Sequence, residues 1–261
     1  MSHLVFDIET VPDVDLGRRL YNLAGLSDEE VMKCMFTLRR QDTGGSEFLP
    51  HDQHRIVSIS CVLRANDTLK VWSLGTLQST EQELVERFFD GIERYSPCLI
   101  SWNGSGFDLP VLHYRALKYG VRAPRYWEVG NEDQTFRYNN YLGRFHWRHI
   151  DVMDVLSGYQ SRAKASLEAM ATMIGLPGKL GFSGDKVADA YLAGELTRIR
   201  QYCETDVINT YLVYLRFELM RGNFTPERYA EEVERMKTLL RGGTASEPHF
   251  TEYLRAWEAQ A

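Results

Sequence analysis

Two carboxylates near the start of the chain stand two residues apart in an apolar setting. Leu4 to Thr10 reads Leu-Val-Phe-Asp-Ile-Glu-Thr, and on a β-strand the alternation of side chains places Asp7 and Glu9 on one face. Two like charges on a buried strand are unfavourable unless a cation compensates them, and carboxylate oxygens suit Mg²⁺ or Mn²⁺. The pair alone is more typical of a strand end whose acids face water, and a metal site at this position needs further ligands elsewhere in the chain.

A third carboxylate follows a turn of small residues. The stretch Ser101-Trp-Asn-Gly-Ser-Gly-Phe-Asp108 comes at the end of a short apolar run, at the kind of position where ligands bind in open α/β sheets. Asn103 can hydrogen-bond the turn or a substrate, and Asp108 falls in the first turn of a helix. Aspartate is also common there because it interacts favourably with the helix dipole, so both interpretations of Asp108 stay open.

The last candidate pair lies on a helix in the C-terminal half. Tyr202-Cys-Glu-Thr-Asp206 places Tyr202 and Asp206 four residues apart, on one helix face, and Ile199, Val207 and Tyr211 can pack that helix on a sheet. Tyr-x-x-x-Asp alone is common, whereas the three patterns in this order coincide in fewer than about one random chain in a thousand. Their joint occurrence indicates a single site.

The elements that must position these residues alternate between strand and helix. Two strands joined by a turn at Asn66-Asp67 predict a hairpin beside the first strand, and a buried strand and further helices follow. The expected strands are His54 to Leu63, Leu69 to Ser73 and Cys98 to Trp102, and the expected helices are near 80–93, 107–119, 152–159, 166–175, 184–193 and 195–221. From His149 onward the chain is expected to be helical. The pattern predicts an α/β fold with a mixed sheet.

Three segments fall outside this alternation. The excursion, residues 12–53, contains a helix over about 28–40 that opens with a capping box at Ser27 and Glu30. Residues 124–148 interleave aromatic side chains with arginines and predict no regular element; they fit either a groove for a nucleic-acid strand or a solvated loop. Thr225-Pro226 opens a last amphipathic helix to about 240, and Gly242 to Ser246 is expected to link it to a short terminal helix.

Composition and charge limit the class of protein. With 261 residues, of which 44% are hydrophobic and 25% charged, the chain can build a sizeable globular core. A net charge of −6 argues against non-specific coating of nucleic acid, but it is compatible with a local basic channel. The four cysteines form no C-x-x-C pair, which favours reduced thiols. We expect no signal peptide and no membrane span, and hence a soluble cytoplasmic protein.

The three motifs together resemble those of a known enzyme superfamily. Phe6 to Thr10, Asn103 to Asp108 and Tyr202 to Asp206 resemble the exonuclease motifs of the DEDD 3′–5′ exonucleases, tyrosine subtype; the histidine subtype would need histidine at Gln201. The residues in and around these motifs are most similar to those of the proofreading exonuclease domain of family-B DNA polymerases and of stand-alone bacterial proteins related to it. The resemblance spans residues 3–221 without the excursion. It implies a ribonuclease-H-like fold with a mixed five-stranded sheet over 1–221, and 222–261 is then a helical extension.

The resemblance also implies the catalytic chemistry. Asp7, Glu9, Asp108 and Asp206 would hold two Mg²⁺ or Mn²⁺ ions. Two ions about 4 Å apart stabilise both the attacking and the leaving oxygen of an in-line displacement and lower the pKa of bound water. Tyr202 would orient the attacking water rather than act as a base, because an unperturbed phenol has a pKa near 10. Alternatively, Tyr202 is a packed aromatic whose hydroxyl caps a core network.

Substrate contacts are expected around these residues. Thr10 and Asn103 are candidates within the motifs, and Trp102 and Phe107 can stack terminal bases, although aromatics at such positions are also common in cores. Two further carboxylates follow His149, and we interpret them as structural residues or as supports for the metal ligands rather than as an additional metal ligand; they are Asp151 and Asp154.

The predicted activity is removal of nucleoside monophosphates from the 3′ end of single-stranded or frayed nucleic acid, with DNA favoured. Two alternatives remain: an RNA-trimming 3′–5′ exoribonuclease and a non-catalytic single-strand-binding module that accompanies a polymerase. The sequence does not separate DNA from RNA, because the distinction rests on contacts to the 2′-hydroxyl. A proofreading or repair role would come through a DNA polymerase or repair partner.

Overall fold

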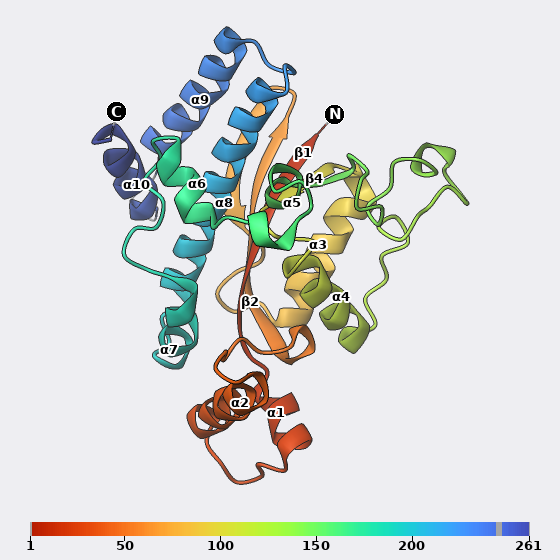
Figure 1. The fold of residues 1–261 in the computed structure, drawn as a ribbon, viewed down its shortest axis with the longest axis vertical. Helices are drawn as coiled ribbons and strands as arrows, with labels where there is room; N and C mark the ends of the chain where they lie inside the picture. The colour runs from red at the N-terminus through yellow and green to blue at the C-terminus, as the bar shows by residue number, and fades with distance from the viewer. Residues whose placement is uncertain (1, 244–246, 261) are drawn as a thin grey trace.

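The computed structural model describes residues 2–243 and 247–260 and is built around a mixed five-stranded sheet (Figure 1). The strand order is β3-β2-β1-β4-β5. The central strand β1 (His3–Pro12) pairs antiparallel with β2 (His54–Ala65) and parallel with β4 (Cys98–Ser101). The edge strands are β3 (Thr68–Ser73) and β5 (His149–Asp151). The predicted α/β class and mixed sheet are confirmed.

The two faces of β1 pack against different helices, as period-two alternation requires. Phe6 lies in the core formed with α3 (Glu81–Tyr95) and α4 (Asp108–Tyr119). Val5 lies in the core formed with α8 (Leu196–Met220) on the opposite face, and Figure 1 shows the helices on the two sides of the sheet. Asp7 and Glu9 share the face of Val5, so both carboxylates point toward α8.

The C-terminal helices pack against α8. They are α9 (Pro226–Arg241), with Thr225 as N-cap and proline at its start as predicted, and α10 (Pro248–Glu258). Tyr253 of α10 donates a hydrogen bond of 2.6 Å to the side-chain oxygen of Asn209, which is buried within α8. Shorter helices complete this side of the molecule: α5 (Val152–Leu156), α6 (Leu167–Met173) and α7 (Val187–Leu192). Within the described residues, no helix is long and apolar enough to cross a membrane.

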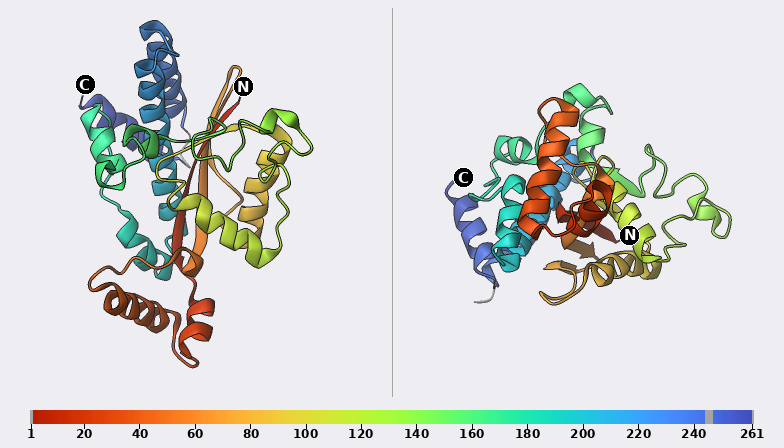
Figure 2. Two further views of the ribbon diagram at one scale, coloured as in Figure 1. Left: turned by 45° about the vertical axis from the view of Figure 1, so that its right-hand side comes forward. Right: turned by 90° about the horizontal axis from the view of Figure 1, so that it is seen from below.

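The excursion folds into two helices beyond the end of β1, α1 (Val14–Tyr21) and α2 (Asp28–Thr43) (Figure 2). The capping box at the start of α2 is confirmed, whereas α1 was not predicted. A buried ion cluster ties the excursion to the main body. Asp13, the N-cap of α1, accepts hydrogen bonds from Arg115 at 2.6 Å and Lys118 at 2.9 Å. Arg115 also donates to Glu81, at the start of α3.

The expectation of helix from His149 onward is wrong at its beginning. His149–Asp151 forms β5, which pairs with Leu99–Ser101 of β4 before α5 starts. A strand of three residues carries too little periodicity to be recognised, and it forms because β4 offers a parallel partner. Residues 124–148, to which the sequence assigned no regular element, contain one 3₁₀ turn at Gln134–Phe136 and otherwise consist of turns and irregular structure. The expected linker lies partly outside the described residues, at 244–246.

Candidate active site

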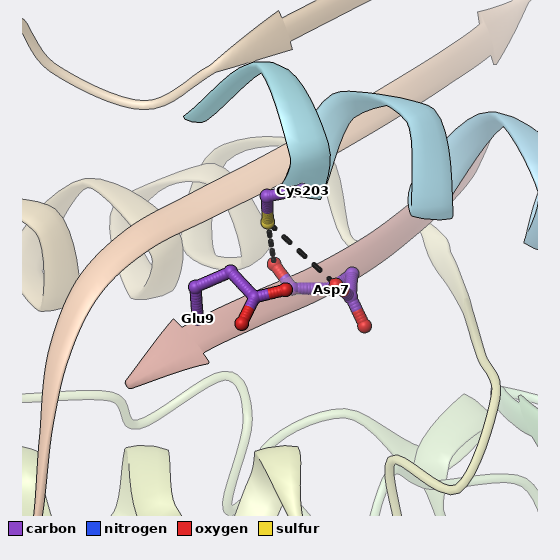
Figure 3. A group of neighbouring side chains, drawn as sticks. All are labelled: Asp7, Glu9 and Cys203. Atoms are coloured by element: carbon purple, nitrogen blue, oxygen red, sulfur yellow. Dashed lines mark hydrogen bonds between the residues drawn. The ribbon is translucent and has the colours of Figure 1, made fainter. Parts of the chain in front are cut away.

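The first two carboxylates lie on β1 beside a thiol from α8 (Figure 3). One ligand atom each of Asp7, Glu9 and Cys203 lies within 4.8 Å of the others. The Cys203 thiol donates to the backbone oxygen of Asp7 at 3.5 Å and to its Oδ2 at 3.6 Å. The pairing of β1 with β2 shifts register between Glu9 and Thr10, and such a bulge re-aims side chains locally. β1 therefore presents its two acids just before the shift in its pairing with β2, which continues to Pro12.

Asp108 joins this group from the first residue of α4. Its Oδ1 accepts a hydrogen bond of 3.1 Å from the backbone N–H of Ile8, which lies between the two acids of β1. The turn before it requires glycine at position 104, where a Cβ would approach the Cβ of Ser101 to 2.5 Å. A Cβ at Gly106 would approach the Asn103 Oδ1 to 2.5 Å and displace that amide. The sequence of this turn thus allows the backbone to fold back and place Asp108 against β1.

Tyr202 and Asp206 reach the same group from α8. Both are largely buried, with 7% and 8% of their surface exposed, and they lie one turn apart on one helix face as predicted. Val207, beside Asp206, packs into the core under α8. The packing of this helix on the sheet therefore holds the fourth carboxylate and the phenol over β1.

Burial and mutual repulsion shift the titration of the four carboxylates. Desolvation raises the pKa of Asp108 to about 7 and that of Asp206 to about 6. The pKa values of Asp7 and Glu9 are raised well above their usual range, first by burial and then by the other carboxylates of the group. Burial, with the neighbouring Asp206, also raises the pKa of Tyr202 far above that of a free phenol. The four carboxylates are difficult to ionise at the same time unless positive charge is present. Their oxygens are the ligands that hard divalent cations prefer.

Lys179 and Phe182 border this group and were missed by the sequence analysis. The positive charge of Lys179 partly opposes the rise in the pKa of Glu9 and of Asp206. Its Nζ lies 5.9 Å from the centroid of the Tyr202 ring. The Phe182 ring lies 5.0 Å from that of Tyr202. These residues lie between the helices expected near 166–175 and 184–193, and no local pattern indicates that this segment folds over Tyr202.

The predicted substrate-binding residues divide into two groups. The Thr10 hydroxyl lies 2.8 Å from Nδ1 of His54, and Asn103 Oδ1 accepts a long hydrogen bond of 3.5 Å from Lys164. Phe107 directly precedes Asp108 and is partly buried. Trp102, in contrast, packs against the core on the α8 side of the sheet. Its position matches the core alternative.

Asp151 and Asp154 have structural partners. Asp151 accepts hydrogen bonds of 2.9 Å from the backbone N–H groups of Asn103 and Ser105 and so braces the turn that leads to Asp108. Asp154 is paired with Arg144 at 3.0 Å and Lys164 at 3.1 Å. Asp151 thus helps to hold Asp108 in position, which is one of the two roles expected for it.

Comparison with known proteins identifies the family of this chain. Residues 46–257 match a family described as a predicted 3′–5′ exonuclease related to the exonuclease domain of PolB. The chain belongs to this family. The fold is accordingly ribonuclease-H-like, and the matched region takes in α9 and nearly all of α10, beyond the limit of 221 reached by the motif resemblance. The acids of β1 precede the matched region, and the structure connects them to it through Asp108 and α8.

Several DNA polymerases are similar to this chain. The chain is 28% identical over 215 residues to a DNA polymerase of Pyrococcus glycovorans and 29% identical over 215 residues to one of Thermococcus gorgonarius, in each case over 76% of this chain and 27% of the polymerase. It is 24% identical over 150 residues to the catalytic chain of DNA polymerase epsilon from Aspergillus fumigatus, over 54% of this chain and 6% of that protein. The exonuclease-family chain thus spans about a quarter of the length of the first two polymerases.

Proposed function

We propose that this chain is a divalent-metal-dependent 3′–5′ exonuclease that hydrolyses phosphodiester bonds at the 3′ end of single-stranded or frayed nucleic acid. The observation that supports it most is the convergence of Asp7, Glu9, Asp108 and Asp206 from three separate elements on one buried spot. A fold gains no stability from four acids whose ionised forms repel one another. Such an arrangement is retained where positive charge arrives with a ligand.

The same four residues would hold two Mg²⁺ or Mn²⁺ ions. Bound there, the ions would neutralise the carboxylates, stabilise developing charge on the phosphate and lower the pKa of the attacking water. The donor set fits, because it consists of carboxylate oxygens, and the Cys203 thiol beside it has its pKa raised by burial and stays protonated. The thiol therefore acts as a hydrogen-bond donor to Asp7.

Tyr202 serves as an orienting group in this proposal. Because its pKa is raised by burial and by Asp206, the phenol keeps its proton and can donate a hydrogen bond, while its oxygen can accept one from the attacking water. Phe182 and Lys179 lie close to the ring and restrict its movement. The residue fixes the position of the water and does not itself remove a proton.

The substrate end is assigned to the side of the site bordered by Thr10, Asn103 and Phe107. Relatedness to DNA polymerases favours DNA over RNA, and release of nucleoside monophosphates follows from attack at the terminal phosphodiester. A polymerase or repair protein would be the partner in a proofreading or repair role.

Digestion of matched 5′-labelled DNA and RNA oligonucleotides with Mg²⁺, Mn²⁺ or EDTA tests the proposal. We expect stepwise shortening that needs the metal and is faster on DNA. Asp206→Asn should abolish it, whereas Asp90→Asn, at an exposed position on α3, should not. Normal turnover by Asp206→Asn, or turnover in EDTA, would refute the metal assignment, and preference for RNA would favour the exoribonuclease alternative.

A further inference from the structure

The excursion places an exposed aromatic ring beside the proposed active site. Phe48 is 55% exposed, and its ring centroid lies 5.4 Å from that of Phe107 and 5.3 Å from that of His54. Phe107 is the residue before Asp108, and His54 is hydrogen-bonded to Thr10. The ring of Phe48 therefore extends the surface formed by Phe107, outward from the acidic group.

The backbone that carries Phe48 is fixed on both sides. The carbonyl of Phe48 accepts a hydrogen bond of 2.8 Å from Arg39 of α2, and the next residue, Leu49, is 2% exposed in the core of the excursion. Nε2 of His51 lies 2.8 Å from the carbonyl oxygen of Gly106, which joins the excursion to the turn that precedes Asp108. The exposure of Phe48 is thus a property of a well-anchored segment.

The chemistry of this surface suits a flat, uncharged ring. Two phenyl rings lie next to each other, and burial lowers the pKa of His54 to about 4, so this imidazole adds no charge at neutral pH. A half-exposed ring on a fixed backbone loses little conformational freedom when a ligand stacks on it. Nucleobases of any sequence stack on aromatic side chains. In the proposed function, the bases at the 3′ end of the substrate are the flat rings that would bind here.

We propose that Phe48 and Phe107 together form the surface on which the bases at the 3′ end of the substrate strand stack. The excursion then has a role in holding the strand end. This inference rests on the proposed function, and it adds a residue outside the three motifs to substrate binding.

A binding cycle with abasic DNA tests this role. Affinities are measured by fluorescence anisotropy in an Asp7→Ala background, which prevents cleavage, for a 5′-labelled single strand and for the same strand with its two 3′-terminal nucleotides abasic. Stacking on an aromatic side chain is worth about five-fold to a hundred-fold in affinity per base. Phe48→Ala should weaken binding of the intact strand within that range and leave binding of the abasic strand unchanged, and Phe48→Tyr should restore binding.

The matched control is Leu20→Ala, which truncates another half-exposed apolar side chain of the excursion, on α1; it should bind both strands as the parent does. Equal loss on intact and abasic strands would show that Phe48 only supports the fold and would overturn the inference. Unchanged binding of the intact strand would overturn it as well. Failure of the parent protein to bind any single strand would refute the proposed function, and the inference with it.

Discussion

Asp108→Asn should stabilise the metal-free protein at alkaline pH. The carboxylate is 4% exposed, and its Oδ1 accepts the N–H of Ile8. The oxygen of an asparagine amide can accept the same bond, so the substitution removes a charge while conserving the contact. Because burial raises the pKa of Asp108 from 3.8 to about 7, ionisation opposes folding.

The magnitude follows from that shift. The difference between the two pKa values corresponds to a decrease of about 4 kcal/mol in the free energy of unfolding of the wild type at pH 8. This is an upper limit, because the neutral amide of the variant would let the neighbouring acids ionise in its place. We expect a gain of about 1–3 kcal/mol, or a rise of about 3–10 °C in Tm for a chain of this size. Because the pKa of Asp108 is raised on folding, the wild type is not penalised below about pH 4 and loses stability as pH rises through about 7. The stability gained by the variant should therefore vanish at acid pH.

Thermal unfolding in EDTA between about pH 4.5 and pH 8, repeated with excess Mg²⁺, measures this effect. Mg²⁺ should stabilise the wild type, because it binds only the folded state, and should stabilise Asp108→Asn much less. The exposed Asp90→Asn serves as the control and should follow the wild type. If the variant is less stable than the wild type in EDTA at pH 8, or gains as much stability from Mg²⁺, then the charge of Asp108 does not oppose folding or the residue is not a metal ligand.

The other predictions concern catalysis and the anchoring of the excursion. Tyr202→Phe should lower kcat by one to three orders of magnitude through loss of one orienting hydrogen bond; unchanged kinetics across the pH range would assign Tyr202 to packing. Arg115→Met should lower the free energy of unfolding by about 3–5 kcal/mol in urea titrations, because it removes the cation that pairs with Glu81 and leaves Asp13 with Lys118 alone. Arg87→Met, at an exposed position, should not. Burial opposes ionisation of Asp13, but Arg115 and Lys118 lower its pKa to about 2, so this stability is present above about pH 4 and should fade as pH falls toward 2; a pH-independent difference would contradict the assignment. Blunt, fully paired duplexes should be degraded more slowly than frayed ends, because unpairing costs a few kcal/mol, and a 3′-phosphate should inhibit; equal rates on the two kinds of end would contradict a site that takes single strands.

The sequence predicted those parts of the site that depend on local periodicity. Alternation along β1 predicted that Asp7 and Glu9 lie on the face of the strand that does not carry Phe6. The helical repeat predicted that Tyr202 lies beside Asp206. It did not predict Phe48 or Lys179, because their positions depend on contacts between segments far apart in the chain, such as Phe48 with Phe107. β5 was missed for a related reason, since its three residues become a strand only when β4 lies beside them.

Digestion of a linear and a circular single-stranded DNA of the same sequence distinguishes a 3′–5′ exonuclease from an endonuclease. With Mg²⁺, we expect a 5′-labelled linear strand to shorten one nucleotide at a time and a 3′-label to be released at once as a mononucleotide. The circle should stay intact. Asp7→Ala should leave both substrates unchanged. Cutting of the circle as readily as the linear strand, or release of the 5′-label first, would contradict the assignment of a 3′–5′ exonuclease.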